Sequence, residues 1–415
     1  MKFDSIIIGG GLSGLTCGIS LAKAGNKVAI VAAGQSTLHF SSGSFDLLGY
    51  DSKGNIIENP VEAIAKLGGN HPYSKVGAEN IESLASAAEA VLTASGLKVK
   101  GNTSKNHFRI TPMGVLKPTW LTLEDYLTTD NQQALPYKKV ILCNIAGFMD
   151  FPVEFIAEGL RKVETEVDSK ILTISALKER RMSPSEMRSA NISKILSTDE
   201  TLREIADVIN ENSKDADAVL LPAIVGMNND ENVIKLKSML NKPMFMVATL
   251  PPSVPGVRVQ KMLRSYFERL GGVFMLGNTV TGAVIDNGKV VSLETSALPD
   301  DNLYADNYVL ATGSFQSEGL KSNYVKVFEP IFDLDVDAGD NRTDWIDENV
   351  YNAQPYMTYG VKTNNQLQTQ KNGSVIENLY AIGSVLSGHN AIKQADGTGV
   401  SLITAVAVAK NILNK

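Results

Sequence analysis

Three glycines near the start of the chain have the spacing of a turn that binds phosphate. Gly9, Gly11 and Gly14 follow the strand-like run 3–8 in a G-x-G-x-x-G pattern. The first glycine of such a turn permits a tight bend, the second lets the backbone approach a pyrophosphate, and the third lets a helix pack on a strand. Amide groups at the helix start then attract the phosphate. We predict a dinucleotide or flavin site formed by Gly9, Gly11, Leu12, Ser13 and Gly14.

The elements around this turn support the prediction. Residues 12–24 are typical of a helix that stops at Gly25, and residues 27–32 are typical of a second parallel strand. About 20 residues beyond the glycines, a Rossmann unit usually carries an acidic residue that anchors an adenosine ribose. Here that position falls on 32–35, Ala-Ala-Gly-Gln. The usual anchor for adenosine is therefore missing, and a glycine turn that serves packing alone remains the alternative.

Composition limits the class of protein. The 415 residues are 43% hydrophobic and 20% charged, with a formal net charge of -6, which is typical of a globular protein with a large core and without a nucleic-acid surface. No run of 18 apolar residues exists, and the fold begins at residue 3, so we expect a cytoplasmic protein. The two cysteines, Cys17 and Cys143, are too few for an iron–sulfur cluster and are expected in the core. We expect no metal site.

Three loops carry polar side chains that could contact a ligand. Residues 34–47 follow the carboxyl end of a strand, where ligands of open α/β sheets lie, and they are rich in hydroxyls. Residues 106–120 hold a histidine, two cations and a tryptophan, in an expected hairpin. Residues 249–258 combine a proline-rich loop, a helix start and Arg258. Each loop also has an interpretation without a ligand. Residues 34–47 can be an ordinary Ser/Gly loop, residues 106–120 an exposed strand, and residues 249–258 a stiff linker between domains.

The pattern changes at residue 138. Strands expected at 140–145, 171–177, 218–224 and 244–250 alternate with helices, and this alternation predicts a parallel α/β domain. We therefore expect an α/β protein with a Rossmann-like flavin-binding domain, formed by 1–137 and 251–415. The segment 138–250 is an inserted domain for substrate or partner, because it has no glycine turn of its own. A meander is expected from residue 271 and a closing helix at 400–413.

The order of these motifs resembles that of the two-dinucleotide-binding flavoproteins. A strand ends in Ala-Thr-Gly at 311–313, and Tyr-Ala-Ile-Gly at 380–383 precedes a glycine-rich turn and the last helix. In detail, residues 35–44, 71–73, 249–253 and 381–386 look like the B subunits of anaerobic glycerol-3-phosphate dehydrogenases. The resemblance covers essentially the whole chain, since these segments run from end to end.

The family implies oxidation of sn-glycerol 3-phosphate to dihydroxyacetone phosphate, with electrons passed to a quinone. It implies FMN as cofactor, and a complex in which the A subunit bears FAD, the C subunit bears iron–sulfur clusters, and a partner attaches this chain to the inner membrane. Two departures from ordinary FAD sites fit that picture, namely the missing acidic residue near Ala32 and Ser384, which stands where an aspartate commonly follows glycine. FAD remains the alternative to FMN. The further flavin contacts that the resemblance and the loops suggest are Ser41, Ser42, Gly43, Ser44, Thr312, Gly313, Gly383, Ser384, Gly397, Thr398 and Gly399.

Oxidation of a secondary alcohol needs a base for the hydroxyl proton and, for this substrate, cations for the phosphate. His39, His107 and His389 lie in loops expected to face the flavin, and each is a candidate base. A hydrogen-bonded structural histidine is the alternative for each. The candidate cations are Arg109, also counted in the catalytic set, Lys117 and Arg258.

Two other functions remain open at the level of the sequence. The chain can be a flavin protein for electron transfer or assembly that never meets substrate. It can also be a fumarate-reductase-like enzyme acting on a carboxylate, although such a site prefers a denser cluster of arginine and histidine than this sequence supplies.

Overall fold

The computed structural model describes residues 2–415, which form two compact units. The first unit comprises the residues up to 37 together with 46–96 and 263–415, and the second comprises 38–45 and 97–262. The predicted insertion 138–250 lies inside the second unit, which takes in further residues on both sides. Alternation of helices and strands cannot reveal these additions, because they depend on pairing between distant short strands such as 44–45 and 121–123.

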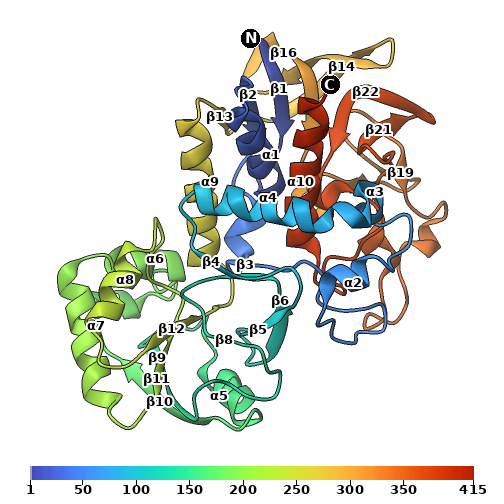
Figure 1. The fold of residues 1–415 in the computed structure, drawn as a ribbon. Helices are drawn as coiled ribbons and strands as arrows, with labels where there is room; N and C mark the ends of the chain where they lie inside the picture. The colour runs from blue at the N-terminus through green and yellow to red at the C-terminus, as the bar shows by residue number, and fades with distance from the viewer. Residues whose placement is uncertain (1) are drawn as a thin grey trace. The chain divides into compact units, whose positions relative to one another are not determined.

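The first unit is built on a parallel sheet (Figure 1). Its parallel strands are, in spatial order, β13 (Val273–Leu276), β2 (Val28–Ala32), β1 (Lys2–Ile8), β16 (Leu298–Leu310) and β22 (Ser374–Ala381). Helix α1 (Leu12–Lys23) connects β1 to β2, as predicted from the glycine turn. The Rossmann-like fold predicted from the sequence is thus confirmed.

One prediction for this sheet was wrong in detail. Strand β13 was expected to begin a meander, but it pairs in parallel with β2 at the sheet edge. The antiparallel hairpin consists of β14 (Val280–Asp286) and β15 (Lys289–Thr295), with the predicted Asn-Gly turn between them. The loop at 277–279 separates β13 from this hairpin, and a short apolar strand has no periodicity that would reveal its partner.

The last helix, α10 (Gly397–Leu413), is apolar on nearly every side. It packs against α1 and against α4 (Ile81–Ala94), so it is a core helix rather than a surface one. Its burial fixes where its first turn lies, next to the segment that begins at Asp46.

The other helices of this unit are α2 (Pro60–Ile64) and α3 (Pro72–Val76), and its remaining strands are β17 (Lys321–Ser322), β18 (Val327–Phe328), β19 (Val336–Asp337), β20 (Gly360–Val361) and β21 (Gln368–Lys371).

The second unit has its own parallel sheet, as predicted. The strands are, in spatial order, β10 (Glu166–Leu172), β9 (Lys139–Ile145), β11 (Ala218–Pro222) and β12 (Met244–Val247). The helices are α5 (Val153–Arg161), α6 (Ser189–Ile195), α7 (Asp199–Asn212), α8 (Glu231–Ser238) and the start of α9 (Val254–Arg269). The strand predicted at 171–177 lies at 166–172, because this edge strand is mostly polar and the apolar residues that follow it form a short 3₁₀ turn.

Two small antiparallel sheets complete the second unit. One has the order β3 (Ser44–Phe45), β7 (Leu121–Leu123), β4 (Val99–Gly101), and the other β6 (Leu116–Thr119), β5 (His107–Ile110), β8 (Thr128–Thr129). The hairpin predicted around residues 108–110 is therefore present, and all four residues of β5 are buried. Among the helices of residues 2–415, none combines the length and the apolar character needed to cross a membrane.

Candidate functional site

Of the three glycines in the turn after β1, one has room for a side chain and two do not. Gly9 has φ +118°, and a Cβ atom there would overlap the backbone carbonyl of Ala311 at the end of β16. A Cβ at Gly14 would overlap the carbonyl of Gly9. At Gly11, the N-cap of α1, a Cβ would meet only the Cβ of Ser36, at 3.8 Å. No side chain caps α1, so its first turn suits a phosphate group.

Other predicted flavin residues of the first unit lie around this turn. Gly383 has φ +72°, and a Cβ there would lie 2.7 Å from the hydroxyl of Ser13 in α1. Thr312 follows Ala311, which touches Gly9, and its Oγ1 is buried with no hydrogen-bond partner among the residues described. The structure therefore brings together the segments 9–14, 311–313 and 383–384, as a shared cofactor site requires. Ser384 itself is half-buried.

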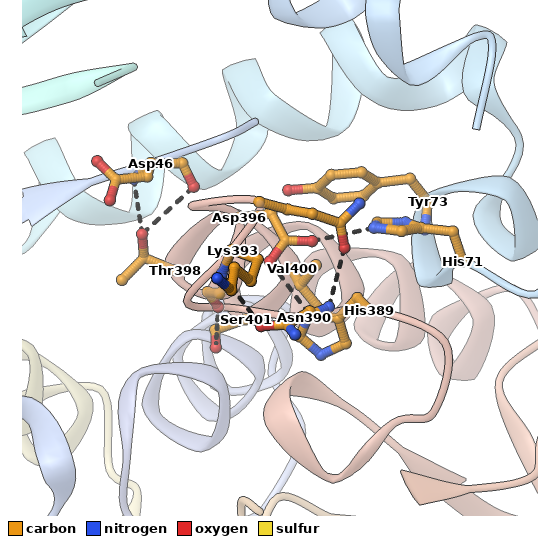
Figure 2. A network of polar contacts seen from close by, with 12 residues as sticks. Asp46, His71, Tyr73, His389, Asn390, Lys393, Asp396, Thr398, Val400 and Ser401 are labelled. Carbon is orange, nitrogen blue, oxygen red and sulfur yellow. Dashed lines mark hydrogen bonds and ion pairs between the residues drawn. The ribbon is translucent and has the colours of Figure 1, made fainter. Parts of the chain in front are cut away.

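The start of α10 holds the segment that follows β3. The amide of Asp46 donates to Thr398 Oγ1 at 2.6 Å, and the amide of Gly399 donates to the Asp46 carbonyl at 2.8 Å (Figure 2). A Cβ at Gly399 would collide with the Tyr73 hydroxyl and with residues 46 and 47, so this glycine has a packing role. The N–H of Gly399 already donates to the Asp46 carbonyl. A ligand at this helix start would therefore have to contact earlier residues, such as Gly397.

The contact between Thr398 and Asp46 gives a first testable expectation. Thr398→Val should lower the free energy of unfolding by about 1–3 kcal/mol, because the Asp46 N–H loses its acceptor. Thr398→Ser keeps the hydroxyl and serves as the control. Urea unfolding of both variants measures the difference. Equal midpoints would show that the hydrogen bond between Asp46 and Thr398 contributes nothing to stability.

A histidine–aspartate–histidine cluster lies beside this helix start. Asp396 is fully buried, with Oδ2 at 3.0 Å from His71 Nε2 and Oδ1 at 3.2 Å from His389 Nδ1. Figure 2 shows the two imidazole rings converging on the carboxylate from different loops. A cavity of about 750 Å³ adjoins it, and its lining includes His71, Gly388 and Lys66. This volume is within the range of small-molecule sites.

The hydrogen bonds fix the protons in the cluster. His71 Nδ1 accepts the amide hydrogen of Tyr73 at 3.1 Å, so the proton of this neutral ring is on Nε2 and is donated to Asp396. Burial raises the pKa of Asp396, but His389 and His71, which donate hydrogen bonds to its two oxygens, outweigh it and hold this pKa well below its usual range. The carboxylate is therefore ionised.

His389 is the histidine that this arrangement leaves chemically available. Its Nδ1 donates to the carboxylate, and its Nε2 has no hydrogen-bond partner within residues 2–415. An imidazole held in this way has a lone pair on Nε2 that can accept a proton. Sequence reasoning named His389 but missed Asp396 and His71. The position of Asp396, seven residues after His389 and directly before the glycines of the helix start, could have drawn attention to it.

The other two candidate bases lie in the second unit and have different surroundings. His107 is buried, and its Nε2 is 3.2 Å from Thr122 Oγ1, which fits the structural alternative. His39 is half-buried in a short 3₁₀ helix. Burial lowers the pKa of His39, a hydrogen bond with the Gln260 side chain opposes this, and the charge of Lys261 adds to the lowering. Within residues 2–415, no carboxylate holds the ring of His39 in the way that Asp396 holds His389.

Residues 41–44 of the predicted hydroxyl loop and the three cations also belong to the second unit. Ser42 and Ser44 share a hydrogen bond of 2.8 Å, and Ser41 Oγ accepts the amide hydrogen of Gly43, which has φ +77°. The three predicted cations differ in environment. Arg258 is ion-paired with Asp125 at 2.7 Å, Lys117 is half-buried on β6, and Arg109 is buried on β5.

Comparison with known proteins identifies the family. A family model described as an FAD binding domain matches residues 4–400. A curated relative from Yersinia enterocolitica, named as the B subunit of anaerobic glycerol-3-phosphate dehydrogenase, is 41% identical over 100% of this chain and 99% of its own length. Proteins of the same name from Yersinia pseudotuberculosis and Pectobacterium atrosepticum are 41% and 37% identical, with the same coverage. The chain belongs to the family of anaerobic glycerol-3-phosphate dehydrogenase B subunits.

Membership of this family makes the chain part of a flavoprotein oxidoreductase, as the sequence predicted. The open N-cap at Gly11, the uncapped start of α1 and the unpartnered hydroxyl of Thr312 fit a flavin, either FMN or FAD. The cysteines fit no redox role, since burial raises the pKa of both Cys17 and Cys143 to about 12.

Proposed function

We propose that the chain is the flavin-bearing B subunit of an anaerobic glycerol-3-phosphate dehydrogenase. In this reaction sn-glycerol 3-phosphate is oxidised to dihydroxyacetone phosphate, and the electrons pass on to a quinone. The observation that carries the proposal is similarity over the full length of proteins with that name, at 37–41% identity. The glycine turn, whose N-cap position is open to a phosphate, supports it independently.

When bound, a flavin would supply the two-electron oxidant for the hydride on C2 of the substrate. The chain supplies the base, because His389 Nε2 takes the proton of the 2-hydroxyl group. Asp396 Oδ1 accepts the Nδ1 proton of His389 and keeps it in place, and His71 donates a hydrogen bond to the second oxygen of that carboxylate.

The cofactor of this proposal is FMN, with FAD as the alternative. Strand β2 ends at Ala32, and the residues after it, Ala33 and Gly34, are exposed and carry no carboxylate for an adenosine ribose. Against this, the matching family model is that of an FAD binding domain. Mass spectrometry of the flavin released on denaturation distinguishes the two.

Electrons leave through partners, which we take to be the FAD-bearing A subunit together with the iron–sulfur C subunit that holds the complex at the inner membrane. The relatives are named as B subunits, which supports a complex. The chain itself has two buried thiols, whereas an iron–sulfur cluster needs about four cysteines. The segment 138–250 is the docking candidate, and its exposed large apolar side chains are Met149, Phe155, Ile171, Met182 and Ile234.

Rapid mixing under anaerobic conditions tests the function. Glycerol 3-phosphate is expected to bleach the visible absorbance of the flavin-loaded chain, whereas glycerol, which lacks the phosphate, is not. The isolated chain is expected to show little quinone reduction, and the activity should return when the A and C subunits are added.

Two results would contradict parts of this proposal. Bleaching only in the assembled complex would place the substrate on a partner and restrict this chain to electron transfer or assembly. Full turnover of the isolated chain with a menaquinone analogue would show a self-sufficient flavoenzyme.

A further inference from the structure

Arg109 is a buried cation without a counter-charge. Its side chain is 5% exposed, and within residues 2–415 no hydrogen bond or ion pair involves its guanidinium group. Its Nε is sealed from solvent and has no acceptor. Burial of a charged group is strongly unfavourable unless the charge is paired, so such a side chain indicates that a ligand supplies the missing anion.

A second cation lies on the strand next to Arg109. In the antiparallel pair of β5 and β6, Lys117 lies directly opposite Arg109, and Thr128 of β8 lies opposite on the other side. Directly opposite side chains share a face of the sheet, and like charges in such a pair are unfavourable. His107 and Thr119 are on the same face, two residues along, and neither side chain carries a negative charge.

Tyr126 and its neighbours form a second group close to Arg109. The charges of Arg109 and Arg258 both act on the Tyr126 hydroxyl, which donates to the carbonyl of Ser42. Burial raises the pKa of Tyr126, although the two arginines oppose this shift, so the hydroxyl remains protonated and its single proton is donated to the Ser42 carbonyl.

Arg258 differs from Arg109 because its charge is already paired. Its Nη1 donates to Asp125 Oδ2 at 2.7 Å, and Lys237 Nζ approaches the other oxygen of that carboxylate at 4.0 Å. Lys100 Nζ donates to the Tyr126 carbonyl at 2.6 Å, and the nearby Glu124 is exposed. Asp125 thus faces several cations, and the local excess of positive charge favours a dianion over a carboxylate.

We propose that Arg109 is the seat of a phosphate monoester dianion, with Tyr126 and the loop at Ser42 beside it. A planar guanidinium group matches two oxygens of a phosphate. The identity of the ligand as the phosphate of glycerol 3-phosphate rests on the proposed function. The phosphate of FMN is the other source of the same chemistry, in which case it does not lie at the turn of Gly9 to Gly14. Arg258 has a supporting role, which is to hold Asp125.

The test uses the flavin-loaded full chain and Arg109→Gln, with thermal unfolding followed at constant ionic strength. Inorganic phosphate and glycerol 3-phosphate should raise the unfolding temperature of the wild type, as ligands of the folded state do, whereas glycerol should not. Arg109→Gln should lose this response, which means an affinity weaker by a factor of about 100 or more. Arg180→Gln, an exposed arginine of the same unit, should respond like the wild type.

A second readout separates a ligand seat from a structural residue. Without phosphate, Arg109→Gln should be at least as stable as the wild type, because the substitution removes an unpaired buried charge. Arg109→Lys keeps the charge but loses the bidentate geometry, and we expect its phosphate affinity to be about tenfold weaker. An unchanged phosphate response in Arg109→Gln, or a variant that is unstable even without phosphate, would overturn the proposal.

The two possible sources and the proposed function are distinguished in the same experiment. If Arg109→Gln is purified without flavin, the seat belongs to the cofactor phosphate and the assignment to substrate is wrong. If phosphate binding depends on Arg109 while glycerol 3-phosphate never bleaches the flavin, Arg109 is a phosphate site but the proposed function is wrong.

Discussion

Asp396→Asn is expected to lower the rate of flavin reduction by glycerol 3-phosphate on the order of 10²–10⁴-fold, the range of a general base, while flavin remains bound. Asp396 accepts two hydrogen bonds, one from His71 Nε2 and one from His389 Nδ1. A carboxylate has an oxygen for each, but asparagine has one oxygen and one amide group. One of the two histidines must therefore change its proton position.

His389 is the ring that has to change. His71 Nδ1 already accepts the amide hydrogen of Tyr73, so His71 must keep its proton on Nε2 and take the asparagine oxygen. The asparagine amide then faces His389 Nδ1, and the proton of that ring moves to Nε2. The atom that has to accept the substrate proton is then already protonated, and the base is lost although every side chain stays in place.

Measurement of single turnovers between pH 6 and 9 checks this expectation. The pKa of Asp396 is lowered in the folded state, so its ionised form contributes stability that is complete above the unfolded value of about 3.9 and is lost only as pH falls below it. The charge of the wild-type carboxylate is thus constant over the assay. His389→Gln should match Asp396→Asn, and Asp306→Asn, an exposed carboxylate of the same unit, should be neutral. A rate within a factor of three of the wild type would exclude His389 as the base.

The parts of the fold that depend on neighbouring residues could be predicted from the sequence. The strand, turn and helix around Gly9 to Gly14 are consecutive, so their pattern can be recognised within one short stretch of sequence. The parallel sheet of the second unit was also predictable, because its apolar strands alternate with amphipathic helices such as α7. The mostly polar edge strand β10 was displaced in the prediction, since its residues carry no apolar period.

What could not be predicted depends on contacts between distant residues. His71 and Asp396 are 325 residues apart in the chain, and nothing in either sequence neighbourhood indicates that they touch. For the same reason His389 could not be separated from His39 and His107, which occur in similar loops. Arg109 and Arg258 also look alike in the sequence, and only the position of Asp125 shows which of the two has a paired charge.

The glycine turn itself gives the second large effect, through two substitutions that look similar in sequence. Gly11 has φ -83°, which any residue adopts, and a side chain there would enter open space next to Ser36. Gly11→Val should therefore fold with a stability within about 1 kcal/mol of the wild type. It should nevertheless lose flavin, with affinity weaker by about 100-fold or more, because the side chain occupies the position where the backbone must approach the phosphate.

Gly14→Ala should show the opposite behaviour. Its Cβ would overlap the carbonyl of Gly9 and lie 3.4 Å from Ile7 Cγ2, so α1 would have to move away from β1. We expect a loss of more than about 3 kcal/mol in the free energy of unfolding, and loss of flavin only as a consequence of unfolding. The ratio of flavin to protein absorbance, together with urea unfolding of the flavin-free chains, separates the two effects. A yellow, fully loaded Gly11→Val protein would show that no phosphate lies at this turn, and a Gly14→Ala protein of normal stability would show that helix and strand are not packed as closely as their glycines indicate.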